Sequence, residues 1–535
     1  MYLLSNSSRT PVAARLKSPI FPTDDGSTKF EPDRAQWSAL VRSTSTPPAA
    51  ALGLTSDEVV LFRRELLSAA RHWTHRLQLI AEKHQLPAFE LPASIDGHVE
   101  PRIVGTGHQP HVFHSGTIFK YDIAAQFATE RRGVALSIVM DTDRGDAGRF
   151  AFPRAIDTGV AQVSSLEFAT LATPASLFDN GYILPVTELT QVRHRVGRQL
   201  ELLGKHAAFE SFSAAMDVFT ALAGQKVTEA QSIARRCLGR ATQTWELPLT
   251  YLCQRAGFRQ GLMHVMRDAA AFHACYNETL DEWRTRRRIR NGLNPFPRLK
   301  QRERRYELPI WAINLRNDER LAIWVEPERH RVRLFAGSQE IGLLTPDSVE
   351  WPEEAQGFLI APRAALISMM FRTLCCDFFL HGLRGRSYDG FTDRLIANYC
   401  HMRTPQFAVA SMSRLLFPDE FRRSQQAAAW HQEARYWAHH PECLLLDVEL
   451  PPQDRDALAK IVGRKAELLR SIAERSGTAR PTRHEHSLLQ GLRRAVASIL
   501  ETQQAASHSL NWSPAAMEAI RYRTYPWFFH CDSRS

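Results

Sequence analysis

The sequence predicts an α/β protein built around a parallel β-sheet, and two stretches carry this prediction. Residues 102–120 have the pattern of a short strand, a polar loop broken by glycines and the start of a helix. Residues 134–140 form a continuous apolar run, Val-Ala-Leu-Ser-Ile-Val-Met, of the kind that strands buried on both faces show. Strand, loop, helix and strand make one βαβ unit, in which the two strands are parallel.

The loop within residues 105–116 has the composition of a ligand-binding turn. Its glycines let backbone N–H groups approach a ligand, and the N-terminus of the following helix favours an anion. The loop and the first turns of this helix supply the first candidate substrate-binding residues, which are Thr106, Gly107, Gln109, Ser115 and Lys120. Lys120 lies one turn into the helix, where its ammonium group either reaches an anion or stays in solvent.

Three histidines, His108, His111 and His114, crowd the same loop and are candidate catalytic residues. The spacing His-x-x-His-x-x-His offers metal ligands, but Pro110 and the loop setting disfavour a shared tetrahedral site, so we predict no metal. The interpretation that we favour is that the histidines hydrogen-bond a phosphate or a carboxylate. A purely structural role is the remaining alternative.

Acidic residues follow the second strand. Asp141 and Asp143 are candidate catalytic residues, and Asp146 is a candidate substrate-binding residue. Such carboxylates bind Mg²⁺ or a substrate amine, or act as a general base, and the alternative is that they cap loops and helices. In open α/β sheets ligands bind at the carboxyl ends of the strands, so the histidine loop and the aspartates should face one crevice.

A second α/β stretch is predicted in residues 361–420. An apolar run at residues 378–383 is followed by a short loop, a helix and a further strand at residues 407–410. We expect these strands to return to the same sheet. They would complete the crevice with further substrate-binding candidates, which are His381, Arg384, Arg386, Tyr388 and Asp389.

Periodicity divides the rest of the chain. A start rich in Ser, Thr and Pro predicts an extended arm, and a capping pattern at residues 55–58 opens a helix. Helical patterns dominate after residue 190, and alternation of period two after residue 306 indicates a small antiparallel sheet. The predicted segments are 1–54 (N-terminal arm), 55–189 (first part of the core), 190–305 (helical insertion), 306–360 (antiparallel sheet), 361–420 (second part of the core) and 421–535 (C-terminal helical region).

Two apolar stripes in the C-terminal region predict a helical hairpin. They run through residues 454–476 and 485–504, and a segment with Gly477 and Pro481 separates them. Such a coiled-coil-like hairpin is a natural dimerisation element. We therefore expect a homodimer.

Composition disfavours several classes of protein. No apolar run approaches the roughly 18 residues that span a bilayer, and the start lacks the layout of a signal peptide, so we expect a cytoplasmic protein without membrane contact. The eight cysteines show no zinc-finger spacing. The net charge of +10 arises mainly in residues 284–305, which hold ten basic residues and one acidic residue. This segment is a solvated surface or a basic rim that attracts phosphates, and without an aromatic-interleaved motif nucleic acid is disfavoured.

Three blocks of the chain resemble one known family. They are Thr-Gly-His-Gln-Pro at residues 106–110 with Phe113, Gly116 and Lys120; Met-Asp-Thr-Asp at residues 140–143; and Phe-Arg-Thr-Leu at residues 371–374, which leads through Asp377 to the loop at 382–388. The layout is similar to that of the bacillithiol biosynthesis cysteine-adding enzymes, which are cysteine ligases related by fold to class I nucleotidylyl transferases. The chain departs from that pattern at His108, where the family has glutamine, and at Arg384 and Arg386, which interrupt a glycine pair.

The resemblance implies a Rossmann-like core of the class I nucleotidylyl transferase type. It also implies an amide-forming ligase that joins cysteine to a small-molecule acceptor after the carboxylate is activated. An adenine nucleotide and Mg²⁺ are the cofactors that such a site would take. Two alternatives stay open, a nucleotidylyl transferase acting on a small metabolite and a non-catalytic protein that binds a nucleotide or RNA.

Overall fold

The structure, a computed structural model, describes residues 21–42, 50–93, 101–143, 148–156, 161–171, 181–293, 295–383, 385–447, 450–475, 480–507 and 512–530. The chain folds into two units. The first comprises residues 1–159, 163–416 and 522–535, and the second comprises residues 160–162 and 417–521. Within the described ranges, no helix combines the length and the apolar character that crossing a membrane requires.

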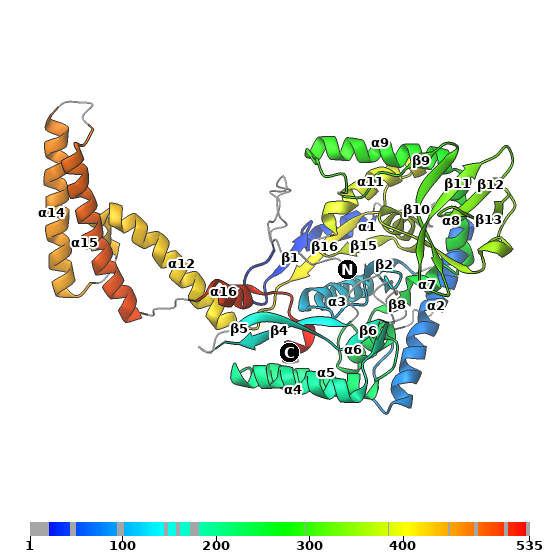
Figure 1. Ribbon diagram of the computed structural model, residues 1–535, viewed down its shortest axis with the longest axis horizontal. Coiled ribbons are helices and arrows are strands. Elements are labelled where there is room, and N and C mark those ends of the chain that lie inside the picture. The colour runs from blue at the N-terminus through cyan, green and yellow to red at the C-terminus, as the bar shows by residue number, and fades with distance from the viewer. Residues whose placement is uncertain are drawn as a thin grey trace, which may run out of the picture. The chain divides into compact units, whose positions relative to one another are not determined.

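The first unit is organised around a mixed sheet in the order β1-β16-β15-β2-β3-β8 (Figure 1). Neighbouring strands from β16 to β8 are parallel, and β1 pairs with β16 in the antiparallel direction. The prediction that residues 100–150 and 361–417 share one sheet is confirmed. The strands are β1 (Thr28–Glu31), β2 (Ile103–His108), β3 (Val134–Val139), β8 (Trp245–Pro248), β15 (Phe378–His381) and β16 (Phe407–Met412).

The strand order reverses its direction beside β2. The chain passes from β2 to β3 and β8 on one side, and then returns to β15 and β16 on the other side. β2 and β15 are therefore neighbours with their carboxyl ends at the same edge, with Phe378 opposite Val104. In parallel sheets a crevice opens at such a reversal, and it is the usual place for a ligand.

The sequences of β2 and β3 fit their buried positions in the sheet. Each residue of β3 is buried, as its uninterrupted apolar run predicts. In β2, Gly105 lies where a Cβ atom would be 2.6 Å from the Phe371 ring and 2.8 Å from Sγ of Cys376. Because neither group can move aside cheaply, glycine at this position lets β2 pack against the segment that precedes β15.

Helices pack on the sheet, and the loops that join its strands to them lie at its carboxyl edge. The predicted capping box is present at Thr55 and Glu58, where α2 begins. Helix α3 follows β2 in the chain, and α11 follows β15. The helices of the first unit named below are α1 (Trp37–Arg42), α2 (Ser56–Lys83), α3 (Ser115–Glu130), α10 (Ala365–Met370) and α11 (Arg386–Cys400), with a π-helical turn at Phe371–Cys375 after α10.

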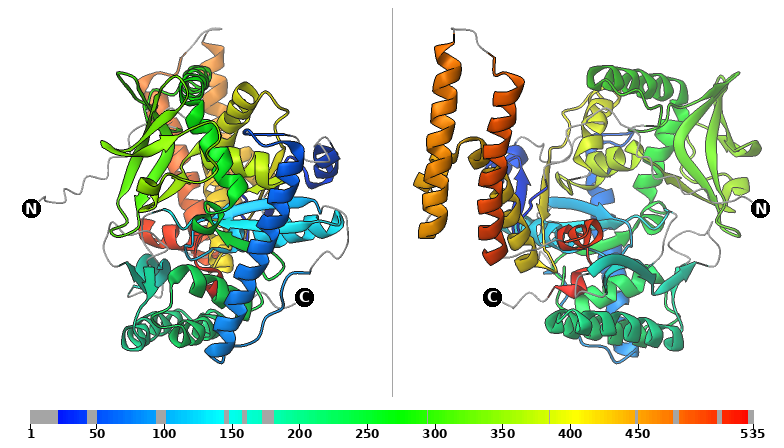
Figure 2. Two further views of the ribbon diagram at one scale, coloured as in Figure 1. Left: turned by 90° about the vertical axis from the view of Figure 1, so that its right-hand side faces the viewer. Right: turned by 60° about the vertical axis from the view of Figure 1, so that its left-hand side comes forward.

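The structure differs from the predicted segments in the arm and in the helical insertion, and also in the last residues of the C-terminal region. The predicted arm contains β1 and Trp37, which is fully buried in the core of the sheet. The predicted helical insertion contains β8, which adds a strand to the same sheet. Its helices are α4 (Val186–Leu202), α5 (His206–Ala221), α6 (Val227–Cys237), α7 (Leu249–Leu252), α8 (Ala256–Arg267) and α9 (Ala269–Arg287), of which α4 and α5 run side by side (Figures 1 and 2).

A second, antiparallel sheet follows the helices, as the alternation of period two predicts. Its order is β13-β12-β11-β10-β14, and β9 pairs with β10. Its strands are β9 (Gln301–Arg302), β10 (Arg305–Asn314), β11 (Arg320–Pro327), β12 (Val332–Ala336), β13 (Gln339–Leu344) and β14 (Phe358–Pro362). Two small strand pairs are β4 (Arg149–Ala155) with β5 (Ala161–Glu167) and β6 (Ala169–Leu171) with β7 (Gly181–Ile183), and residues 161–162 of β5 are assigned to the second unit.

The second unit is helical. The predicted hairpin is present as α14 and α15, which lie side by side (Figures 1 and 2). Leu458, Val496 and Leu500 are buried with Trp437 of α12 in one apolar cluster. The helices are α12 (Pro418–His439), α13 (Pro441–Asp447), α14 (Pro452–Glu474), α15 (Arg483–Ser507) and α16 (Pro514–Arg521). The predicted C-terminal helical region, 421–535, reaches beyond the second unit, because residues 522–530 belong to the first unit.

Candidate functional site

His108 is the last residue of β2 and stands at the reversal point. Its Nδ1 lies 2.9 Å from the carbonyl oxygen of Gln109, so Nδ1 carries the proton in this contact and Nε2 is the acceptor nitrogen. Burial, with a smaller effect from the charge of Lys120, holds the pKa of His108 well below its ordinary value of 6.5. The imidazole is therefore neutral at pH 7. The ring centroid of His111 lies 6.4 Å away.

Lys120 reaches the same strand end from the second turn of α3. Its side chain is buried, and Nζ donates a hydrogen bond of 2.8 Å to the carbonyl oxygen of Gly107. Burial lowers the pKa of this amine from 10.5 to about 7. Near neutral pH, Lys120 is thus divided between its charged and its neutral form. The sequence left open whether Lys120 is solvated, and the structure places it inside.

His114 serves the start of α3. Its Nδ1 accepts a hydrogen bond of 3.1 Å from the N–H of Gly116, and its carbonyl oxygen accepts one of 2.8 Å from Thr117. It is therefore the N-cap residue of the helix. A Cβ atom on Gly116 would lie 2.7 Å from the carbonyl oxygen of Met412, which shows how closely the helix start approaches the end of β16.

Two distant segments brace the histidine loop. The N–H of Trp527 donates a hydrogen bond of 2.9 Å to the carbonyl oxygen of Phe113. The guanidinium of Arg235, on α6, lies 4.2 Å from the centre of the Phe113 ring and forms an ion pair of 2.5 Å with Glu246 of β8. The sequence contains no motif for either brace. The loop is consequently held from both sides although it is rich in polar residues.

An Arg–Asp–His network lies beside the end of β15. His381 bonds through Nε2 to the buried carboxylate of Asp389, which also receives Arg372 at 3.4 Å. Arg372 is fully buried in the π-helical turn and contacts Asp393 at 2.6 Å. Burial alone would raise the pKa of Asp389, but His381 and Arg372 hold it below its ordinary value. Asp389, predicted to bind substrate, holds His381 through this contact.

The acidic cluster divides into an internal and an outer residue. Asp141 is fully buried, and it accepts hydrogen bonds of 3.0 Å from the N–H and 2.5 Å from the hydroxyl of Thr250. Asp143 is half-exposed, accepts a bond of 3.1 Å from Gln109 and lies 4.0 Å from Arg320. Asp143 is thus the carboxylate that a ligand can approach. The predicted site residues Asp146 and Arg384 lie outside the described residues.

The other predicted residues take up varied positions. Thr106 is buried and its hydroxyl donates to the carbonyl oxygen of Leu380 at 2.9 Å, which ties β2 to β15. Arg386 forms an ion pair with Glu31 of β1. Tyr388 is 41% exposed in the first turn of α11, and its ring centroid lies 5.9 Å from that of Phe296. The structure therefore gathers His108, Lys120 and His381 at the two strand ends.

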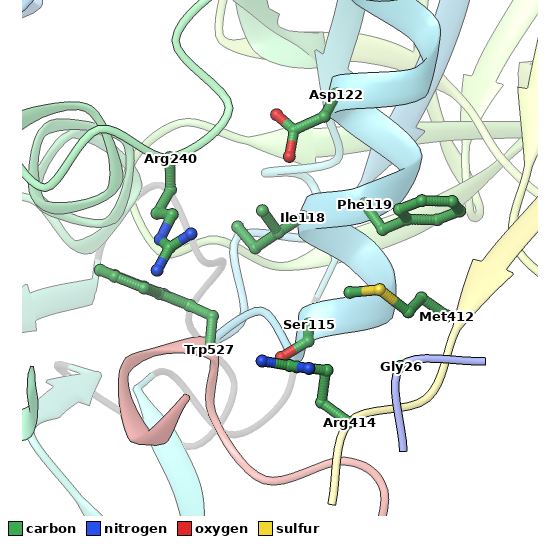
Figure 3. A pocket seen from close by; sticks show the side chains of 9 residues that line it. All are labelled: Gly26, Ser115, Ile118, Phe119, Asp122, Arg240, Met412, Arg414 and Trp527. Atoms are coloured by element: carbon green, nitrogen blue, oxygen red, sulfur yellow. The ribbon is translucent and has the colours of Figure 1, made fainter. Parts of the chain in front are cut away.

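A cavity of about 300 Å³ lies beside the start of α3 (Figure 3). Ser115 is the one predicted site residue that lines it, and the three histidines are not among its lining residues. Two arginines that sequence reasoning missed, Arg240 and Arg414, also line it. Arg240 follows α6 and Arg414 follows β16, and no motif surrounds either residue. The sequence therefore does not indicate that the two arginines line one cavity.

Among the described residues, no group of three or more His, Cys, Asp or Glu side chains is arranged to hold a metal ion. Comparison with protein-family models and with curated proteins finds no match to this chain.

Proposed function

We propose that this protein is a ligase that joins an amino acid, cysteine by the family resemblance, to a small-molecule acceptor. The site lies at the carboxyl ends of β2 and β15, in a Rossmann-like core of the nucleotidylyl transferase type. One observation carries the proposal. Two blocks of the resemblance, residues 106–120 and 371–388, are far apart in sequence, and each contains the carboxyl end of one of two adjacent parallel strands where the strand order reverses.

The side chains at the strand ends suit the chemistry of amide formation. ATP would supply the adenylyl group that activates the carboxylate, and pyrophosphate would be the leaving group. Lys120 in its charged form would bind an anionic oxygen, and His108 would accept a hydrogen bond at Nε2. Asp143, the half-exposed carboxylate, would hold Mg²⁺ together with the phosphates, since this ion is usually bound by one or two carboxylates and the phosphates of the substrate.

His381 is the proposed general base for the attacking amine. Asp389 holds its Nε2, so Nδ1 is the nitrogen that would accept the proton. Gly385 packs closely on this edge of the ring, where a Cβ atom would lie 2.5 Å from Nδ1, so a larger residue would collide with the imidazole. The arrangement of a buried carboxylate and an imidazole that it orients resembles that of other catalytic dyads.

The test is an exchange reaction with the full chain. Labelled pyrophosphate should enter ATP in the presence of one amino acid, with cysteine expected to be the best. Asp389→Asn removes the charge that orients His381 and should lower ligation by about 10²–10⁴-fold. Asp217→Asn, at an exposed ion pair on α5, is the matched control and should leave the rate unchanged. Absence of exchange with every amino acid would refute the ligase.

A non-catalytic binding protein is the second candidate, and one cluster favours it. The guanidinium of Arg287 lies 3.9 Å from the ring centre of Trp283, and that of Arg394 lies 5.5 Å from it. Burial and the nearby charges of Arg394 and Arg386 lower the pKa of Arg287. A basic cluster on an aromatic ring suits phosphate-rich ligands. Binding of single-stranded RNA that weakens steeply with salt, without any exchange activity, would support this candidate.

A further inference from the structure

The cavity beside α3 has one polar and one apolar side. One face of the helix supplies Ser115, Ile118 and Asp122, at intervals that place them above one another. Figure 3 shows the guanidinium group of Arg414 next to Ser115, and that of Arg240 pointing toward the ring of Trp527. All of these residues belong to the first unit.

We propose that this cavity binds a small anion in which a phosphate or carboxylate group is joined to a flat apolar body. The anionic group would lie between Ser115, Arg240 and Arg414, and the apolar body would lie against Trp527 and Ile118. The site is separate from the strand ends of β2 and β15, because neither His108 nor His381 lines the cavity.

The hydroxyl of Ser115 points to a ligand. Ser115 is 6% exposed and lines the cavity, and within the described part of the chain its hydroxyl has no hydrogen-bond partner. An acceptor on a ligand in the cavity would give this hydroxyl a hydrogen-bond partner. His114 already takes the N–H groups of Gly116 and Thr117, so the side chains rather than the helix backbone would hold the anion.

Charge and size define the ligand class. Among the lining residues that the structure describes, Arg240 and Arg414 are basic and Asp122 is acidic. The positive end of the helix dipole lies at Ser115, which further favours an anion there. A volume of about 300 Å³ is at the lower limit of small-molecule sites. A compact monoanion or dianion with one aromatic ring fits these limits.

The test is calorimetric titration of the full chain with phenyl phosphate, benzoate and inorganic phosphate. We expect saturable binding of one or both aromatic anions and weaker binding of inorganic phosphate, which lacks the apolar body. Arg240→Gln should weaken binding about tenfold or more, since it removes a charge-assisted hydrogen bond. Ser115→Ala, which removes only the hydroxyl, should weaken it several-fold.

Two further variants fix the sign of the effect. Asp122→Asn removes the acidic lining residue and should tighten binding about two- to fivefold. Arg193→Gln makes the same charge change as Arg240→Gln at an exposed ion pair on α4 and should leave binding unchanged. No saturable binding of any probe, or equal losses in Arg240→Gln and Arg193→Gln, would overturn the proposal.

The test is independent of the proposed ligase. Asp389→Asn should leave the binding of phenyl phosphate intact. If Asp389→Asn abolished binding while Arg240→Gln did not, the probe would bind at the strand ends and the cavity proposal would fail. If the exchange reaction failed while the cavity variants behaved as expected, only the ligase would be refuted.

Discussion

Raising the pH through 7 should weaken the binding of an anionic ligand at the strand ends, and Lys120 is the reason. Its Nζ is buried against the carbonyl oxygen of Gly107, and its pKa is lowered to about 7. The charged form attracts the anion and dominates below pH 7, and the neutral form dominates above it. His108 stays neutral throughout, because its pKa lies well below 6.5.

The size of the effect follows from that pKa. If only the charged form binds, the apparent Kd is multiplied by one plus ten to the power of pH minus pKa. From pH 6 to pH 8 this factor rises from about 1.1 to about 11, so affinity falls roughly tenfold, or about 1.4 kcal/mol. Above pH 8 it should fall by a further factor of about ten per pH unit.

Calorimetric titration with an ATP analogue at pH 6, 7, 8 and 9 measures this slope. Lys120→Arg keeps the charge at every pH and should bind without the slope, whereas Lys120→Met should bind weakly throughout. Titration of the ligand itself is common to all proteins and cancels in the ratio of their Kd values. A ratio of wild type to Lys120→Arg that stays constant from pH 6 to pH 9 would refute the reasoning.

Three structural predictions accompany this one. Gly116→Ala places a Cβ atom 2.7 Å from the carbonyl oxygen of Met412, at the end of β16, and should destabilise the protein by about 1–3 kcal/mol in thermal melts. The control is Gly463→Ala, where the added Cβ atom has nothing within 4 Å and should stabilise α14 slightly. Arg63→Met leaves the buried carboxylate of Asp377 without its 2.8 Å ion pair, so the loss should be about 3–5 kcal/mol; a melting temperature equal to that of wild type would contradict it. Replacing residues 452–507 by a flexible linker should weaken self-association in light scattering and leave the first unit folded; an unchanged mass would count against the hairpin as a dimer contact.

The βαβ unit could be predicted because its signals are local. The apolar run of β3 is buried along its whole length, and the glycines before α3 mark the loop. The short strand β8 could not be predicted, since its four residues include a proline and lie among helical patterns. Trp245–Pro248 is extended because it pairs with β3, and this contact between segments distant in sequence exists only in the folded chain. Context overrides local preference there.

The candidate site shows the same limit. The sequence placed His108 and His381 beside two short apolar stretches, and the structure has them as the last residues of β2 and β15. The sequence did not indicate that Asp389 would pair with Arg372, or that His114 would cap a helix, because these roles depend on side-chain geometry. Arg240 and Arg414 are 174 positions apart, and only the tertiary fold brings them to one cavity.

The contact of Trp527 with the histidine loop can form only after nearly the whole chain has been synthesised. Phe113 and Trp527, which are joined by a backbone hydrogen bond, lie 414 positions apart. At about 5–20 residues per second, the ribosome needs roughly 20 to 80 s to deliver the second after the first. Until then Phe150 and Phe212 lack the rings of Phe528 and Phe529 that pack on them in the finished protein. The nascent chain thus presents an aromatic surface for tens of seconds, and a chaperone that recognises such surfaces would have time to act on it.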